Sequence, residues 1–121
     1  MRKITVLLVV ALLLLSSCGS VPLTGRNQLL LVSDSEVLAS SLTQYSDYIK
    51  SAPLSTNAKG KAMVTRVGRN IAAATEQYLK SAGLASEVKN FSWEFNLVKD
   101  NQVNAFCMPG GKIVVYEGLL K

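Results

Sequence analysis

The chain has 121 residues, a hydrophobic fraction of 49%, a formal net charge of +5 and no histidine. This length accommodates one small domain. Without Arg2 and Lys3, which belong to a predicted targeting segment, the balance is +3 (11 basic minus 8 acidic residues). The remaining basic residues are scattered along the sequence, so a nucleic-acid partner has little support.

Residues 1–17 have the pattern of a signal peptide. Arg2 and Lys3 precede an apolar run, Ile4 to Leu15, that only Thr5 interrupts. The run is too short for an ordinary transmembrane helix, which needs roughly 20 apolar residues. Leu15-Ser16-Ser17-Cys18 then resembles the lipobox of bacterial lipoproteins. The alternative is an ordinary cysteine beside the signal peptide of a soluble protein.

The lipobox resemblance implies that Cys18 is the lipid attachment site and that the lipid binds the protein to a membrane. It places the protein in the bacterial cell envelope, and Gly19 after the cysteine favours the outer membrane, facing the periplasm. Residues 18–32 are predicted to be a lipidated tether, because Pro22 and Gly25 favour a turn over a regular element. Residues 33–121 are predicted to form the folded domain.

Two amphipathic helices are predicted at the start of this domain. The first begins after Ser33 and ends near Pro53, since a residue before proline is disfavoured in the α region. The second runs from about residue 58 to 81, with Gly83 as its C-terminal cap. Gly68 and the alanines that follow predict close packing against another helix. The expected apolar residues are Val37, Leu38, Leu42, Tyr45, Tyr48 and Ile49 in the first helix, and Val64, Val67, Ile71, Ala74 and Tyr78 in the second.

Three short strands are predicted after the helices, at about 91–97, 103–108 and 113–116. Alternation in the first strand places Phe91, Trp93, Phe95 and Leu97 on one face. Residues 99–102 and 109–111 carry turn chemistry between the strands. The predicted fold class is therefore α+β, two helices followed by a small, mostly antiparallel three-stranded sheet, and from pattern alone a β-meander. Cys107 is predicted to be an apolar filler on a buried strand, with a reactive thiol as the alternative.

The residue identities near the end of the chain are more specific than their hydrophobic pattern. Asn104-Ala105-Phe106, Pro109-Gly110-Gly111 and Gly118-Leu119-Leu120 resemble the segment before the zinc-binding helix of membrane-associated gluzincin metallopeptidases, the family that includes HtpX and the CAAX prenyl endopeptidases. Residues 21–33 and 67–74 resemble the lipoprotein and periplasmic members of this family.

The resemblance implies the front part of a zincin-like domain, in a zinc metalloendopeptidase that cleaves peptides or unfolded proteins of the envelope. The family binds zinc through an H-E-x-x-H helix and a later glutamate. This chain has no such motif and is expected to end shortly before it. We therefore predict no catalytic and no metal-binding residue here, zinc only in the full-length enzyme, and no activity from this chain alone.

The resemblance also implies a substrate site. In such enzymes the strand that carries a sequence like Asn104-Ala105-Phe106 forms the edge of the active-site sheet, where an extended peptide can pair with it. Asn104, Ala105, Phe106 and Cys107 are therefore the candidate substrate-binding residues, and the alternative is that this strand is paired within the fold. A different class of function also stays open: a non-catalytic lipoprotein that presents a strand edge to a binding partner.

Overall fold

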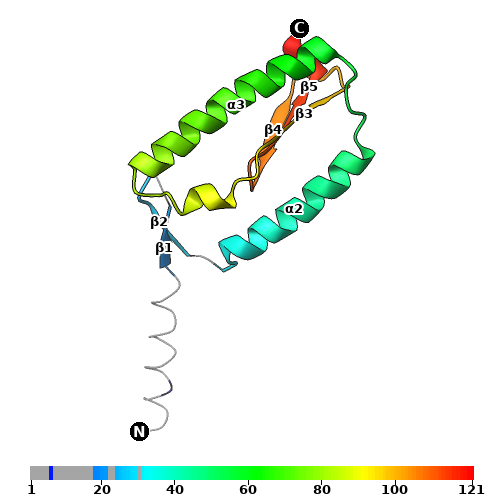
Figure 1. The fold of residues 1–121 in the computed structure, drawn as a ribbon. Helices are drawn as coiled ribbons and strands as arrows, with labels where there is room; N and C mark the ends of the chain where they lie inside the picture. The colour runs from blue at the N-terminus through cyan, green and yellow to red at the C-terminus, as the bar shows by residue number, and fades with distance from the viewer. Residues whose placement is uncertain (1–5, 7–17, 22–23, 30) are drawn as a thin grey trace. The chain divides into compact units, whose positions relative to one another are not determined.

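The computed structural model describes residues 6, 18–21, 24–29 and 31–121 (Figure 1). They form two compact units, one up to Asp34 and one from Ser35 to Lys121. The predicted signal peptide lies outside the described residues, apart from Val6. Within the described part of the chain, no helix is both long enough and apolar enough to cross a bilayer.

The first unit contains a short antiparallel hairpin. Strand β1 (Cys18–Ser20) pairs with β2 (Asn27–Leu29). Gly25, with φ of 64°, donates its backbone N–H to the carbonyl of Val21 at 2.9 Å. The turn expected here is present. Its flanking strands were not predicted, because a Cys-Gly-Ser strand has no apolar alternation.

The second unit begins with two helices, α2 (Asp34–Ser51) and α3 (Ala58–Ser81). Their bounds confirm the predicted ranges. The side chain of Asn57 caps α3 by accepting a hydrogen bond from the backbone N–H of Gly60 at 3.0 Å. At the other end, Gly83 has φ of 76°, and Leu84 N–H donates to Leu79 C=O at 2.8 Å, which closes the helix as the glycine cap predicts.

The strands are β3 (Glu94–Val98), β4 (Ala105–Met108) and β5 (Lys112–Tyr116), in the order β3-β5-β4. The α+β class is confirmed. The sheet is mixed instead of mostly antiparallel, because β5 is parallel to β3 and antiparallel to β4, and the meander order is wrong. Strand β5 lies at the centre of the sheet, and Val114 within it has no exposed surface. Short 3-10 helices cover Glu87–Asn90 and Glu117–Leu120.

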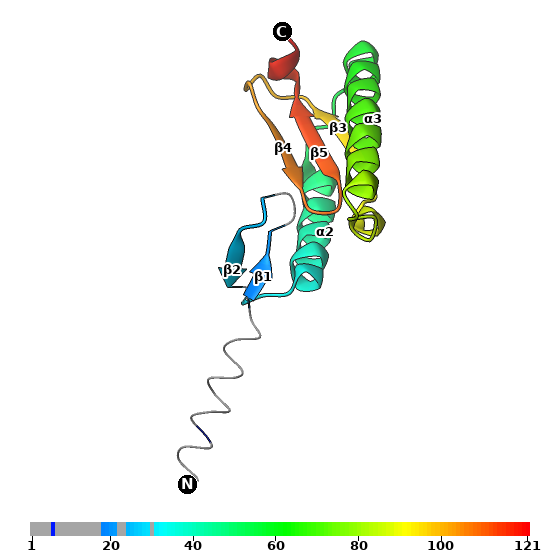
Figure 2. The same cartoon turned by 90° about the vertical axis from the view of Figure 1, so that its left-hand side faces the viewer.

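The two helices cover opposite faces of this sheet (Figures 1 and 2). On the α2 side, Tyr45 forms a buried cluster with Val98 and Val114, against which partly buried aromatic and aliphatic side chains pack. On the α3 side, Gly68 lies against the ring of Phe95 and Gly60 against the side chain of Leu97. The Phe91, Trp93 and Phe95 rings stack in sequence, which confirms that they share one face.

The buried stripe of α3 differs from the predicted one. Val67, Ile71 and Tyr78 are 43%, 57% and 54% exposed, and only Val64 of the larger predicted residues is buried. The small residues of α3 were predicted to pack against another helix. They pack against a strand instead. The Phe95 ring occupies the space that a side chain at Gly68 would need, so the glycine side of α3 turns inward. The buried residues are Gly60, Val64, Gly68, Ala72 and Leu79.

Candidate functional site

Strand β4 forms one edge of the sheet. Its only paired neighbour among the described strands is β5, and β3 lies on the far side of β5. The Pro109-Gly110-Gly111 turn joins β4 to β5, and both glycines have positive φ, 88° and 79°. This conformation is readily available to glycine and lets the chain reverse directly into the central strand.

The hydrogen-bond register of β4 shows which backbone groups face outward. Tyr116 N–H donates to Asn104 C=O at 3.0 Å, and the register pairs Phe106 with Val114. In an antiparallel ladder, residues alternate between pairs that exchange hydrogen bonds and pairs that do not. Asn104 and Phe106 therefore bond to β5. The N–H and C=O groups of Ala105 and Cys107 point away from it, toward the open side of the strand.

The side chains of β4 separate into an anchoring set and an exposed set. Phe106 packs edge-on against Tyr48 (5.4 Å between ring centroids) and Tyr116 (6.3 Å) within the α2-side core. Asn104, Ala105 and Cys107 are exposed. The prediction that Cys107 fills a buried strand is wrong: α3 packs over β3 at the opposite edge, so the face of β4 that carries Cys107 stays open.

A polar network that the sequence did not predict lies on the α2 side of the sheet. The side chain of Lys112 is 5% exposed, and its Nζ donates to the Ser92 carbonyl and to Glu94 Oε1, both at 2.5 Å. Tyr45 donates its hydroxyl to Glu94 Oε2 at 3.0 Å, and Asn96 Nδ2 donates to that hydroxyl at 2.5 Å. Glu94 and Asn96 alternate with the apolar residues of β3, but alternation alone does not identify their partners.

The network changes the acid–base properties of its members. The hydrogen bond from Lys112 lowers the pKa of Glu94. Burial raises this pKa, but its effect is smaller. Burial, followed by the neighbouring Glu94, raises the pKa of Tyr45 to about 12. At neutral pH the carboxylate is therefore charged and the phenol neutral, which is the pairing that the hydrogen bonds require. The network ties α2 to β3 and β5.

An apolar groove of about 300 Å³ lies on the other side of the sheet, between α3 and the end of the chain. Leu119 and Met63 on its rim are 45% and 43% exposed. Val115 and Leu120 line the groove together with Leu119. The remaining lining residues are Val64, Val67, Gly68, Ile71, Phe95 and Ile113.

The residues of this chain do not fit a zinc site of the family's kind. The sequence has no histidine, and in the part of the chain that the structure describes, no three cysteine, aspartate or glutamate side chains gather as a metal would require. Glu94, the carboxylate of the polar network, already accepts hydrogen bonds from Lys112 and Tyr45.

Comparison with known proteins relates the second half of the chain to metallopeptidases. Residues 65–121 match the model of Peptidase family M48. A segment covering 34% of the chain is 49% identical over 41 residues to a mitochondrial metalloendopeptidase OMA1 from Arabidopsis thaliana. A segment covering 35% is 40% identical over 42 residues to the protein of that name from Schizosaccharomyces pombe. The matches span 8% and 12% of those relatives' lengths, and they support a relationship to the M48 zincin family.

Proposed function

We propose that this chain is the amino-terminal part of a lipid-anchored zinc metalloendopeptidase related to Peptidase family M48, and that β4 binds the peptide substrate. The observation that carries the proposal is the position of β4, an edge strand within the segment that matches the family. The proposed cellular location is the bacterial envelope, at the outer membrane and facing the periplasm, on the strength of the lipobox that ends at Cys18.

The proposed substrate role of β4 follows from its free backbone groups. An extended peptide that lies along the edge accepts a hydrogen bond from the N–H of Ala105 or Cys107 and donates one to the corresponding carbonyl. Such pairing is independent of side-chain identity, which suits an enzyme that acts on peptides and unfolded proteins. Asn104 is exposed, and its proposed role is to orient the peptide at one end of the strand. Phe106 holds the edge in position from inside the core.

Zinc is proposed to be held by ligands in sequence outside this chain, and there it would supply the Lewis-acid chemistry of peptide hydrolysis. The contribution of residues 33–121 is to bind and align the substrate. The apolar groove beside Leu119 is proposed to be covered by that additional sequence, because an open groove lined by Ile71, Phe95 and Val115 costs free energy in water. Reading the gene past the codon for Lys121 tests this directly: an open frame that reaches H-E-x-x-H is expected.

Proline substitution tests the edge-pairing role in the full-length protein. Ala105→Pro removes an N–H that points away from β5 and leaves the internal ladder intact, a position where an edge strand tolerates proline. We expect KM for peptide substrates to rise about five-fold, the effect of one lost hydrogen bond. Cys107→Ala, which keeps the backbone, is the matched control and retains cleavage. Unchanged KM in Ala105→Pro and in Asn104→Ala would contradict the substrate role.

A non-catalytic lipoprotein that presents the same edge to a partner is the second candidate. The outward N–H and C=O groups of β4 support this binding role as well as they support the peptidase, because they need no metal to bind an extended segment. A stop codon directly after Lys121, with a soluble domain that unfolds cooperatively, would support this candidate over the peptidase. Binding of peptides without hydrolysis would then be expected.

A further inference from the structure

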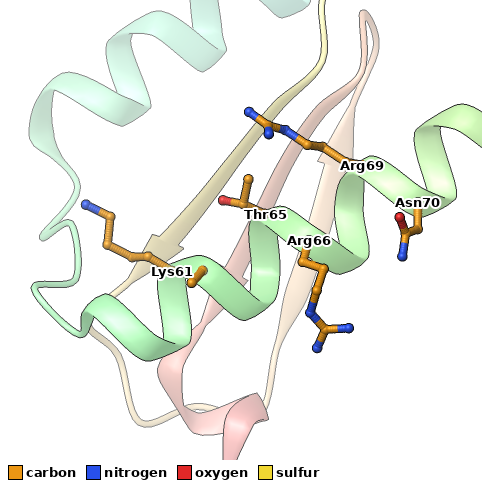
Figure 3. Close-up of a pocket in the computed structure, with 6 residues that line it drawn as sticks. Lys61, Thr65, Arg66, Arg69 and Asn70 are labelled. Carbon is orange, nitrogen blue, oxygen red and sulfur yellow. The ribbon is translucent and has the colours of Figure 1, made fainter.

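The first half of α3 carries basic residues and no acidic one. Lys59, Lys61, Arg66 and Arg69 lie within it, and the first acidic residue of the helix is Glu76. Three of these cations, Lys61, Arg66 and Arg69, line a surface hollow of about 440 Å³, together with Ala62, Thr65 and Asn70 (Figure 3). All four cations are exposed.

These cations take no part in the ion pairs described for the fold. The ion pairs among the described residues are Lys50–Asp47, Lys80–Glu76 and Lys112–Glu94, and none includes them. Lys59 and Lys61 lie in the first turn of α3, where the helix dipole is positive and no acidic residue compensates. The helix is therefore weakened by charges that an anionic partner would neutralise.

We propose that this cationic side of α3 docks on an anionic lipid surface. The proposal rests on the lipid anchor at Cys18, which would keep the domain within reach of a bilayer. It extends the proposed function by giving the domain one orientation on the membrane. The cations span about 15 Å along the helix, from Lys59 to Arg69, at 1.5 Å per residue.

The layout of the side chains favours a surface over a single bound phosphate. In Figure 3, Lys61 and Arg69 extend to one side of α3 and Arg66 extends to the other. They do not converge on one point, as the ligands of an enclosed phosphate do. Cations that are separated along the helix match the many separated charges of a membrane leaflet. Each lysine or arginine near such a surface strengthens attachment about five-fold.

Lysine footprinting of the lipidated chain on vesicles tests the docking. We expect acetylation of Lys59 and Lys61 to slow at least about three-fold on phosphatidylglycerol-containing vesicles, and not on pure phosphatidylcholine vesicles. High salt should remove the protection. Lys50, an exposed residue of α2 on the opposite face of the sheet, is the internal control and should keep its reactivity. Arg66→Gln/Arg69→Gln should remove most of the protection, whereas Lys50→Gln should preserve it.

The outcomes separate this inference from the proposed function. A chain that floats with vesicles but shows no protection of Lys59 and Lys61 overturns the docking alone. Failure to float with either vesicle overturns the anchor and the docking with it, and leaves the substrate role of β4 to its own test. Equal protection by soluble poly-glutamate would also overturn the lipid surface, in favour of an acidic protein partner. Helicity measured by circular dichroism verifies that the double variant is folded.

Discussion

The two faces of the sheet are built in different ways. On the α2 face, Tyr45 and Val114 are 4% and 0% exposed, and the buried Lys112 has its polar partners within the same face. On the α3 face, the contact is made by glycine, with the Phe95 ring against Gly68, and an apolar groove stays open beside it. We call the α2 face the closed face, because large and polar side chains pack on it. We call the α3 face the open face, because it is only partly covered.

The difference shows which part of the fold is self-sufficient. The α2 face satisfies its own buried charge and hydrogen bonds, and these bonds link α2, β3 and β5. The α3 face places Ile71 and Leu119 in water, a cost that covering sequence or a partner would remove. Substitutions on the closed face should therefore act on stability, and substitutions on the open face should act mainly on association.

The largest expected effect is on the closed face. Glu94→Ala removes the carboxylate partner of the buried Lys112 and leaves the Ser92 carbonyl as its hydrogen-bond acceptor, and breaking a buried ion pair costs about 3–5 kcal/mol. We expect about 3 kcal/mol, the lower end, because Glu94 is half exposed. Urea unfolding followed by the fluorescence of Trp93 measures it.

The exposed pair Lys50–Asp47 provides the control for this prediction. Its side chains are 72% and 68% exposed, so Asp47→Ala should change the free energy of unfolding by less than about 0.5 kcal/mol. Equal costs for Glu94→Ala and Asp47→Ala would mean that the Lys112 network does not stabilise the closed face.

The next largest effect is expected at the helix–strand contact of the open face. A Cβ at Gly68 would overlap the Phe95 ring, so Gly68→Ala overpacks this contact. We expect a loss of about 2 kcal/mol, partly restored by Phe95→Leu in the same chain. Thermal unfolding measures both. Gly60→Ala, beside the more flexible Leu97 side chain, should cost less, and a reversed order would contradict the packing described for α3.

Alkaline pH should weaken the closed face selectively. Burial raises the pKa of Tyr45 to about 12, from an ordinary value of about 10. Because the folded-state pKa is the higher one, this stabilisation is present below pH 10 and is lost as the pH rises toward 12. Urea unfolding between pH 9 and about 12 should show the decline, and Tyr45→Phe should make it shallower. An unchanged slope in that variant would assign the decline to other groups, among them Tyr48, whose pKa burial also raises to about 12.

Local patterns were enough to predict the helices and turns. The Pro53 and Gly83 signals predicted the ends of α2 and α3, and Pro109-Gly110-Gly111 predicted the hairpin between β4 and β5. These features depend on residues close together in the sequence. The parallel pairing of β3 with β5 depends on strands that are not adjacent in the chain, and neither composition nor period specifies it.

The candidate site was predictable in position but not in detail. The resemblance pointed to 104–107, and the register then separated the outward groups of Ala105 and Cys107 from the inward Phe106. The Lys112–Glu94–Tyr45 network was missed because its members lie far apart in the sequence. The inward side of α3 was missed because a hydrophobic stripe favours Val67 and Ile71 over glycine, whereas the Phe95 ring needs the glycine.

The smallest effect on stability is expected in the open groove. Leu119 is 45% exposed, so Leu119→Ser should change the free energy of unfolding of this chain by less than about 0.5 kcal/mol, while reducing its self-association in sedimentation experiments. In a longer protein whose additional sequence covers the groove, the same substitution buries a hydroxyl in an apolar site and should cost about 2 kcal/mol. The difference between the cost of Leu119→Ser in the longer protein and its cost in this chain measures how far the additional sequence covers the α3 face. Equal small costs would mean that the groove stays open in the longer protein, and that its apolar surface serves a separate partner.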